Sequence, residues 1–177
     1  MTTNTARRAA YWLALLVPAA LLGGAYVSQY GFGLYPCEMC WWQRYPHMVA
    51  AGVALGALLA SKGAARNKAA GAVLVRIAAL AILASGLIGA FHAGVEYGWW
   101  EGITRCATTA GYGDDPLAAI MNAPVIRCDV APWTLFGISL AGFNFLFSTA
   151  GGIIVLALIG RGKSGSAHRK ARGKAGA

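Results

Sequence analysis

The sequence is poor in charged residues, and this scarcity excludes an ordinary soluble fold. Only 12% of the 177 residues are charged, whereas 58% are hydrophobic. The hydrophobic residues form four long runs, at about 9–29, 41–60, 70–91 and 133–160. Each run has the roughly 20 residues with which a helix crosses a hydrocarbon core of about 30 Å, and an open β-sheet cannot span lipid. The sequence therefore predicts an all-α membrane protein, a bundle of four transmembrane helices.

The chain is expected to contain one membrane domain and a tail. Residues 1–160 form the predicted four-helix domain, with two loops on its outer side. The longer loop, 94–132, is predicted to hold a short surface helix that begins at Asp114-Asp115-Pro116, with an irregular loop as the alternative. Residues 161–177 are predicted to be a disordered basic tail. A cleaved signal peptide is the alternative for 9–29, but this run exceeds the usual apolar core of such a peptide.

Acidic residues are also few, six in all, and the basic residues are unevenly distributed. Twelve of the fifteen Lys and Arg residues fall before the first run, around the connection between the second and third, or after the fourth: Arg7, Arg8, Lys62, Arg66, Lys68, Arg76, Arg161, Lys163, Arg169, Lys170, Arg172 and Lys174. The positive-inside rule therefore predicts that both termini are cytoplasmic and that the cysteines lie on the opposite side. These cytoplasmic ends explain the net charge of +9 without a nucleic-acid partner.

The chain has only four cysteines, Cys37, Cys40, Cys106 and Cys128, all in the outer segments. An even number in an oxidising compartment is expected to pair; of three pairings, proximity favours Cys37 with Cys40 and Cys106 with Cys128. A Cys37–Cys40 bridge closes a very small ring, which stabilises a fold little but suits an exchangeable disulfide. Cys40 lies at the start of the second helix, where the helix dipole and Arg44 favour a thiolate. This pair is therefore interpreted as a redox site.

Other chemistries fit these residues less well, although two purely structural disulfides remain an alternative. Zinc would prefer a second close cysteine pair, and covalent haem needs a histidine where Trp41 stands. The sequence lacks a glycine-rich nucleotide-binding motif, so the expected electron acceptor is a membrane quinone. Arg44 is the candidate to hold a quinone oxygen, and His92 is the candidate to hydrogen-bond to the quinone or pass it protons. Their alternatives are an arginine at the headgroup level and a structural histidine.

Three stretches carry a resemblance to a known family. They are CEMCWWQR at 37–44, His92 with Trp99-Trp100 before Cys106, and Cys128-Asp129 leading into Pro132-Trp133. Together they resemble the disulfide bond formation protein B (DsbB) family of bacterial inner-membrane thiol oxidases, over essentially the whole membrane portion of the chain. The resemblance implies a thiol:quinone oxidoreductase that supports disulfide bond formation, with cytoplasmic termini and periplasmic cysteine loops. A vitamin K epoxide reductase-like quinone reductase and a non-enzymatic protein with four membrane spans are the alternatives.

The resemblance also implies a role for each cysteine. Cys106 is implied to be attacked by a reduced thioredoxin-like periplasmic oxidase of the DsbA type. Cys128 is implied to exchange next with Cys37, which moves electrons from one loop to the other. Cys40 is implied to contact ubiquinone, or another membrane quinone, with Arg44 at the quinone oxygen.

His92 matches a family position near the quinone, but two features depart from the family pattern. Many relatives have two apolar residues between the first two cysteines, where this chain has Glu38 and Met39. A carboxylate beside the first cysteine disfavours its thiolate. The segment 129–132 is also short, which is expected to limit how far Cys128 can move toward the first pair.

Overall fold

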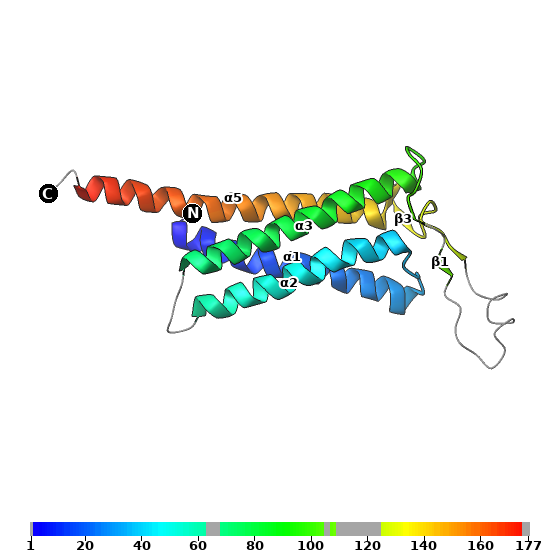
Figure 1. Cartoon of the computed structure of the whole chain (residues 1–177), viewed down its shortest axis with the longest axis horizontal. Helices are drawn as coiled ribbons and strands as arrows, with labels where there is room; N and C mark the ends of the chain where they lie inside the picture. The colour runs from blue at the N-terminus through cyan, green and yellow to red at the C-terminus, as the bar shows by residue number, and fades with distance from the viewer. Residues whose placement is uncertain (1, 63–67, 105–106, 109–124, 175–177) are drawn as a thin grey trace.

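Four long helices and two small sheets make up the described structure. The computed structural model describes residues 2–62, 68–104, 107–108 and 125–174. The helices are α1 (Thr3–Phe32), α2 (Glu38–Lys62), α3 (Lys68–Glu96) and α5 (Leu140–Lys174). The strands are β1 (Ala107–Thr108), β2 (Val125–Ile126), β3 (Thr134–Leu135) and β4 (Ile138–Ser139). Figure 1 shows the helices running along the long axis, with the N-terminus and the end of α5 toward one end and the strands at the other.

The helices pack in a closed ring, α1 on α2, α2 on α3, α3 on α5 and α5 on α1. The prediction of a helical bundle is confirmed. Its main core consists largely of small residues, which allow helices to approach closely in a membrane protein. The fully buried alanines of this core are Ala10, Ala14, Ala50, Ala54, Ala57, Ala78 and Ala79.

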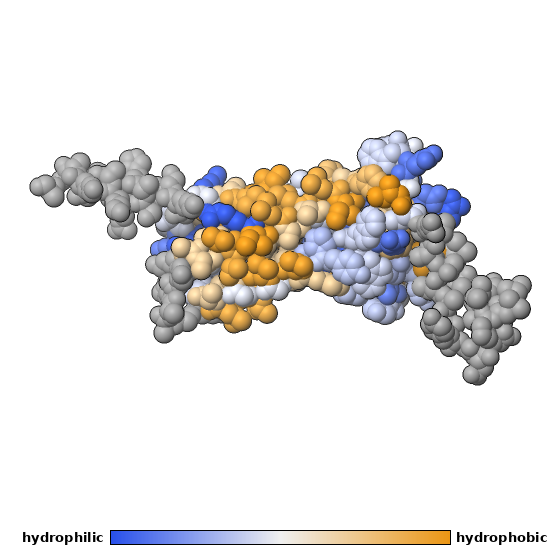
Figure 2. Space-filling model, in the orientation of Figure 1, coloured by the Kyte–Doolittle hydropathy of each residue, from blue (hydrophilic) through white to orange (hydrophobic). Residues whose placement is uncertain are grey.

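Large apolar side chains cover the outside of the bundle, as lipid requires. Leu59, Leu80 and Leu87 are among the exposed ones. Figure 2 shows hydrophobic residues over the middle of the bundle and hydrophilic residues concentrated toward its ends. Three helices are long and apolar enough to cross a membrane: Thr3–Phe32, Ala69–Glu96 and Leu140–Arg161. The remaining helix, α2, is less apolar because its amino-terminal half carries Gln43, Arg44 and His47, which are buried within the bundle.

The fourth apolar run begins as a hairpin, and not as a helix. Thr134 pairs with Ser139 and Leu135 pairs with Ile138, so α5 begins at Leu140 instead of residue 133. The two turn residues have positive φ angles, 52° at Phe136 and 76° at Gly137. This is the geometry of a two-residue hairpin turn whose twist matches that of its strands, and glycine adopts it without strain.

Two further predictions concern the basic tail and the second loop. The sequence predicts a disordered basic tail at 161–177, whereas in the structure the α5 helix continues through Lys174. Its Ala, Lys and Arg residues are good helix formers, and no proline interrupts 161–174. The surface helix predicted at Asp114-Asp115-Pro116 lies outside the described residues.

The close approach of α3 and α5 at Gly152 generates a stability prediction. A Cβ atom at Gly152 would lie 2.6 Å from Leu83 Cγ and 3.2 Å from the Ala79 carbonyl oxygen. Gly152→Val is expected to lower the free energy of unfolding by about 1–3 kcal/mol, because the larger side chain forces the two helices apart. Unfolding by SDS in mixed micelles, followed by circular dichroism, measures this change.

The matched control is Gly160→Ala on the same helix, where an added Cβ meets no atom within 4 Å. This change is expected to be neutral or to stabilise the protein by up to about 1 kcal/mol, because alanine favours a helix more than glycine does. Equal unfolding free energies for Gly152→Val and the unmodified protein would contradict the packing described.

Candidate active site

Cys37 and Cys40 lie at the outer, amino-terminal end of α2. Cys37 immediately precedes the helix, and Cys40 lies in its first turn. The two Sγ atoms are 3.0 Å apart, with Cys37 as the donor, and the Cys40 backbone N–H donates to Cys37 Sγ over 3.3 Å. Cys37 is buried and Cys40 is half-buried. The arrangement suits a pair that alternates between dithiol and disulfide.

The two thiols are chemically unequal. The hydrogen bond to Cys40, and then burial, raise the pKa of Cys37 to about 12, while the contact with His92 acts in the opposite direction. Cys37 therefore keeps its proton at neutral pH and donates it to the Cys40 sulfur. Cys40 also lies where the free N–H groups of a helix start favour negative charge. These contacts favour Cys40, and not Cys37, as the thiolate of the reduced pair.

Cys128 lies against this pair. It shares a small buried cluster with Cys37 and Met39, and the Cys37 thiol is in hydrogen-bonding contact with it. Thr104 Oγ1 donates to Cys128 Sγ over 3.2 Å, and the Met39 backbone N–H donates to the same sulfur. Burial is the main cause that raises the pKa of Cys128. The expectation that the short 129–132 segment restrains Cys128 does not apply, because Cys128 already touches the first pair.

Cys106 lies outside the described residues, but the chain beside it is placed. Ala107 pairs in β1 with Ile126 of β2, which stands two residues before Cys128. Antiparallel pairing thus joins the segments next to the two cysteines of the second loop.

The two residues between Cys37 and Cys40 differ in their surroundings. Glu38 is exposed to solvent, whereas Met39 is completely buried in the core.

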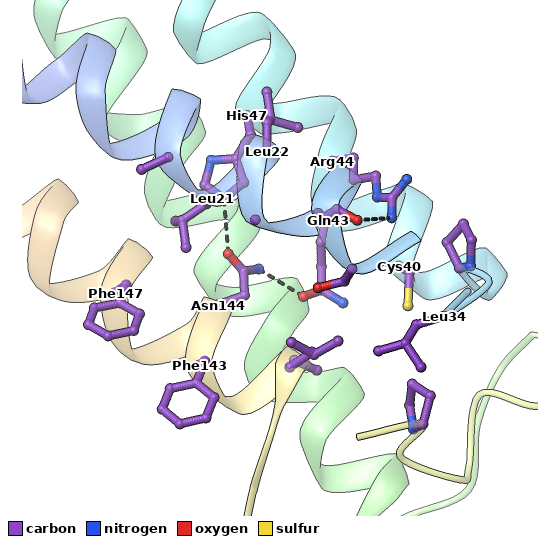
Figure 3. Close-up of a pocket in the computed structure, with 18 of the residues that line it drawn as sticks. Leu21, Leu22, Leu34, Cys40, Gln43, Arg44, His47, Phe143, Asn144 and Phe147 are labelled. Carbon is purple, nitrogen blue, oxygen red and sulfur yellow. Dashed lines mark hydrogen bonds between the residues drawn. The ribbon is translucent and has the colours of Figure 1, made fainter. Parts of the chain in front are cut away.

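A cavity of about 250 Å³ adjoins Cys40 between α1, α2 and α5. Figure 3 shows Leu21 and Leu22 of α1 on one side and Phe143 and Phe147 of α5 on the other. These residues make its walls largely apolar. The polar groups that α2 contributes to the lining are Cys40, Gln43, Arg44 and His47. Their spacing of three and four residues puts them on neighbouring positions of one helix face.

Arg44 is held firmly at the wall of this cavity. Its Nη1 donates to Gln29 Oε1 over 2.5 Å, and its Nη2 donates to the Ala25 carbonyl over 3.3 Å. The guanidinium carbon lies 5.1 Å from the Tyr26 ring centre and 4.9 Å from that of Trp41. These described partners are all neutral, so the positive charge is available to an electron-rich oxygen in the cavity.

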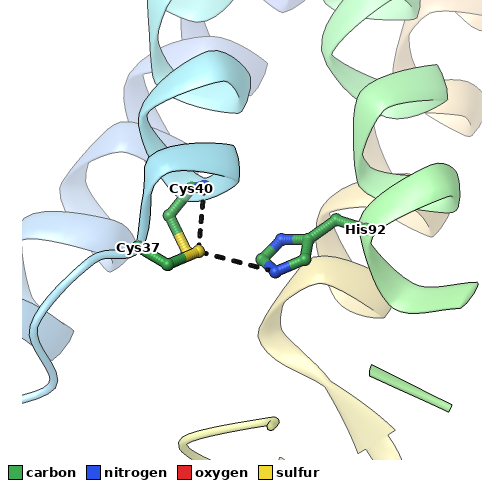
Figure 4. Close-up of side chains that lie close together, drawn as sticks. All are labelled: Cys37, Cys40 and His92. Carbon is green, nitrogen blue, oxygen red and sulfur yellow. Dashed lines mark hydrogen bonds between the residues drawn. The ribbon is translucent and has the colours of Figure 1, made fainter. Parts of the chain in front are cut away.

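A second cavity, of about 280 Å³, adjoins the first and shares Leu34, Tyr35, Cys40 and Pro132 with it. His92 lines this second cavity and does not line the one beside Arg44, whereas Cys40 lines both. Figure 4 shows His92 reaching from α3 to Cys37, with Nε2 3.5 Å from Cys37 Sγ. Glu96, whose side chain is 2% exposed, lies 3.7 Å from the same nitrogen. The structure thus brings His92 to the thiols and not to Arg44.

A hydrogen bond from Gln43 determines where the proton of His92 resides. Gln43 Nε2 contacts the Met39 carbonyl oxygen at 3.2 Å and His92 Nδ1 at 2.8 Å. Because a carbonyl only accepts, this atom of Gln43 must be the amide nitrogen, and His92 Nδ1 must be the acceptor. The neutral His92 ring therefore carries its proton on Nε2, the nitrogen that faces Cys37.

The chain of hydrogen bonds continues from Gln43 deeper into the bundle. Asn144 Nδ2 donates to Gln43 Oε1 over 2.8 Å and to the Ser85 carbonyl oxygen over 3.1 Å. Asn144 Oδ1 accepts from His47 Nε2 over 2.9 Å and from the Ser148 hydroxyl over 2.8 Å. Along this chain each side chain donates a hydrogen bond to the next one, in the direction from His47 to the cysteine pair.

The cysteine pair also offers the ligands of a metal site. Cys37 Sγ, Cys40 Sγ and a ring nitrogen of His92 all lie within 4.8 Å of one another. Thiolate and imidazole ligands suit zinc. The same two sulfurs would be lost as ligands whenever the pair is oxidised, so metal binding and disulfide chemistry exclude each other at this site.

Several polar residues of the site were not predicted from the sequence. They are Gln43, His47, Asn144 and Ser148. One signal was available, because a polar or ionisable residue inside an otherwise apolar membrane run is costly and usually functional. What the sequence does not show is which of these residues meet.

Comparison with known proteins gives the family. The family model described as disulfide bond formation protein DsbB matches residues 7–158. The chain belongs to the DsbB family. Disulfide bond formation protein B of Verminephrobacter eiseniae (strain EF01-2) is 30% identical over 177 residues, covering 94% of this chain and 93% of the relative. The protein of the same name from Acidovorax sp. (strain JS42) is 31% identical over 172 residues, covering 86% of this chain and 92% of the relative.

No solved structure gives a significant match to this DsbB-family chain. The family match spans all four cysteines and most of the four helices, so the resemblance predicted from the sequence is confirmed. Membership of the DsbB family assigns the chain an oxidoreductase role in disulfide bond formation at a membrane.

The unequal thiols of this DsbB-family pair predict selective alkylation. With a pKa of about 12, only about 10⁻⁴ of Cys37 is thiolate at pH 8. Substoichiometric iodoacetamide added to the reduced protein at this pH is expected to label Cys40 at least about tenfold more than Cys37, because the thiolate is the nucleophile. Peptide mass spectrometry measures the ratio.

Raising the pH toward 12 is expected to increase labelling of Cys37, since its raised pKa keeps the thiol protonated below that range. In Cys40→Ala, Cys37 loses the hydrogen bond that contributes most to its raised pKa, and its labelling at pH 8 should rise. Preferential labelling of Cys37 in the unmodified protein would refute the assignment of Cys40 as the nucleophile.

Proposed function

We propose that this protein is a protein-dithiol:quinone oxidoreductase that re-oxidises a periplasmic thioredoxin-like oxidase of the DsbA type. The position of Cys40 carries the proposal, because this residue lines both cavities. On one side Cys40 shares a cavity with Arg44, and on the other side with Cys37 and His92. A single sulfur can therefore receive electrons through thiol exchange and deliver them to an acceptor in the membrane.

The cavity beside Arg44 has the chemistry that a membrane quinone, such as ubiquinone, requires. Its apolar walls suit the quinone ring and its isoprenoid chain. The guanidinium can donate to a quinone oxygen and stabilise negative charge as electrons arrive. Cys40 lies one helical turn from Arg44 on the same helix. When bound, a quinone takes up two electrons and two protons, and we assign Cys40 and Arg44 to its binding.

Electrons enter the protein through the second cysteine pair. A thiolate of the reduced partner attacks Cys106 of the Cys106–Cys128 disulfide and releases Cys128. The second thiol of the partner then displaces Cys106, which leaves the partner oxidised and both cysteines reduced. Each step is a thiol–disulfide exchange, so two electrons pass from the partner to this pair.

The contact between Cys128 and Cys37 supports the next exchange. The Cys128 thiolate attacks Cys37 of the Cys37–Cys40 disulfide and releases Cys40 as a thiolate. Cys106 then displaces Cys37 from Cys128, which restores the Cys106–Cys128 disulfide. The reduced Cys37–Cys40 pair passes two electrons and two protons to the quinone and returns to the disulfide.

His92 acts on the thiols in this scheme. Its Nε2–H faces Cys37 Sγ at 3.5 Å, so it can hydrogen-bond to that sulfur when Cys106 releases Cys37 as a thiolate. Gln43 holds the ring in the tautomer that this contact needs. His92 thus stabilises a leaving thiolate, whereas Arg44 serves the quinone oxygen.

We further propose that α2 is the fourth membrane span and that the protein is a multi-pass protein of the bacterial inner membrane. The α2 helix packs between α1 and α3, and its residues Gln43, Arg44 and His47 are buried in the bundle. The chain termini lie toward the end opposite the strands that flank the second cysteine pair (Figure 1). Basic residues concentrate near these termini and near the connection between α2 and α3. This distribution supports cytoplasmic termini and periplasmic cysteine loops.

Variants of the cavity test the quinone-dependent reaction. Cys40→Ser is expected to abolish reduction of a soluble ubiquinone analogue by a reduced DsbA-type partner, because it removes the sulfur that meets the acceptor. Arg44→Ala should lower kcat/KM for the quinone by about 10²–10³, the usual effect of removing one charge-stabilising donor. Loss of quinone absorbance measures both reactions.

Arg76→Ala is the matched control, because Arg76 belongs to α3 and does not line the cavity. It makes the same chemical change as Arg44→Ala and should leave quinone reduction unchanged. Normal turnover by Cys40→Ser would exclude the proposed mechanism.

The proposed entry point for electrons can be trapped. A DsbA-type partner that lacks its second active-site cysteine is expected to accumulate linked to Cys106, because the partner has no second thiol with which to displace Cys106. Non-reducing electrophoresis should show the linked species with the unmodified protein and with Cys37→Ser, but not with Cys106→Ser. A linked species that persists in Cys106→Ser would show that another cysteine receives the partner.

A further inference from the structure

The cavity beside Arg44 has a second polar pole, formed by His47. This residue follows Cys40 by seven positions and Arg44 by three, which correspond to rises of about 10.5 Å and 4.5 Å along the helix. All three residues line the same cavity, and His47 is 3% exposed. Figure 3 shows His47 beside Leu22, linked to Asn144, with Cys40 farther along α2.

The hydrogen bonds of His47 fix its tautomer. Its Nε2 lies 2.9 Å from Asn144 Oδ1 and 3.2 Å from Ser148 Oγ. The Asn144 orientation is set by its amide nitrogen, which donates to the Ser85 carbonyl oxygen, so Oδ1 must accept. His47 Nε2 therefore carries the proton. Nδ1 of the neutral ring is left with a lone pair and acts only as an acceptor.

The neutral form of His47 is also the one that its surroundings favour. Its contacts to Asn144 and Ser148 are neutral, and Arg44 already brings a positive charge to the same cavity. A second buried cation nearby would be disfavoured by repulsion and by loss of hydration.

One atom of His47 remains unsatisfied. Its Nδ1 is buried and has no hydrogen-bond partner within the part of the chain that the structure describes. A buried acceptor without a partner destabilises the protein, because it has lost its hydrogen bonds to water without replacement. A residue that lines a cavity and keeps such an atom points to a ligand that supplies a donor.

We propose that His47 Nδ1 accepts a hydrogen bond from a hydroxyl group of the reduced quinone, at the end of the ring away from Cys40 and Arg44. The inference rests on the proposed function, since it concerns the product of that reaction in the same cavity. A quinone oxygen only accepts hydrogen bonds, whereas the hydroxyl of a hydroquinone donates one. His47 therefore discriminates between the two forms and binds the reduced form more tightly.

This preference has a consequence for the energetics of electron transfer. Tighter binding of the reduced form makes a bound quinone a stronger oxidant. A tenfold preference corresponds to about 30 mV for a two-electron couple. Asn144 and Ser148 act as positioning residues. They contact the Nε2–H group of His47 and so leave the Nδ1 atom of His47 as the acceptor.

The inference predicts how two ligands bind at equilibrium. A short-chain ubiquinone and its ubiquinol are titrated into full-length protein carrying Cys37→Ser, which blocks electron transfer, and tryptophan fluorescence reports binding. The protein with His47 is expected to bind the ubiquinol about tenfold more tightly than the ubiquinone. His47→Leu should remove this preference, because leucine cannot accept a hydrogen bond.

Two further variants separate recognition from packing. His47→Gln keeps both a donor for Asn144 and an acceptor for the ligand, so it should retain much of the preference. Ser61→Ala removes a hydrogen bond to the Leu58 carbonyl on the same helix but lies outside the cavity lining, so the preference should be unchanged. Circular dichroism checks that every variant is folded, and His47→Gln keeps the test decisive if His47→Leu does not fold.

The outcomes distinguish the inference from the proposed function. If His47→Leu still prefers the ubiquinol, or Ser61→Ala loses the preference equally, His47 is not the acceptor and the inference fails alone. Tighter binding of the ubiquinone than of the ubiquinol would overturn it as well, since an acceptor at Nδ1 favours the reduced form. If neither ligand binds the protein with His47, both the inference and the proposed function are wrong.

Discussion

The structure depends on one constraint: a polar side chain among lipid-facing helices must find its partner inside the protein. Five polar residues of the site meet this constraint in one connected chain of hydrogen bonds that joins α2, α3 and α5. Two backbone carbonyls, those of Met39 and Ser85, fix its direction, because each can only accept. The members of the chain are His47, Ser148, Asn144, Gln43 and His92.

The same chain links the two halves of the proposed chemistry. At its outer end it leaves the His92 proton facing Cys37, where a sulfur takes up negative charge during exchange. At its inner end it leaves a lone pair on His47 beside the cavity. The close packing of alanines below the site holds the helices that carry these groups. Rigid support of this kind lets two different reactions share the single sulfur of Cys40 without rearrangement of the bundle.

Much of the architecture could be predicted from the sequence because it follows from local properties. Run length and composition indicated four helices, and the CxxC spacing placed Cys37 and Cys40 at a helix start. The hairpin before α5 was missed because its strands are apolar and merge with the helical run. The pairing of Gln43 with Asn144 joins residues 101 positions apart, and helical periodicity gives no sign of such a partner. The approach of Cys128 to Cys37 is equally non-local, and chain length alone suggested the opposite.

The separation of the two cavities bears on a side reaction that any thiol enzyme working with a quinone must limit. Quinones are electrophiles, and a thiolate can add to the ring and form a stable thioether instead of passing on electrons. Of the described cysteines, only Cys40 lines the cavity beside Arg44. Cys37 and Cys128 are buried in a neighbouring cluster outside the lining of this cavity. With a quinone in this cavity, as proposed, only the Cys40 sulfur would meet the electrophile, and Cys37 and Cys128 would be kept away from it.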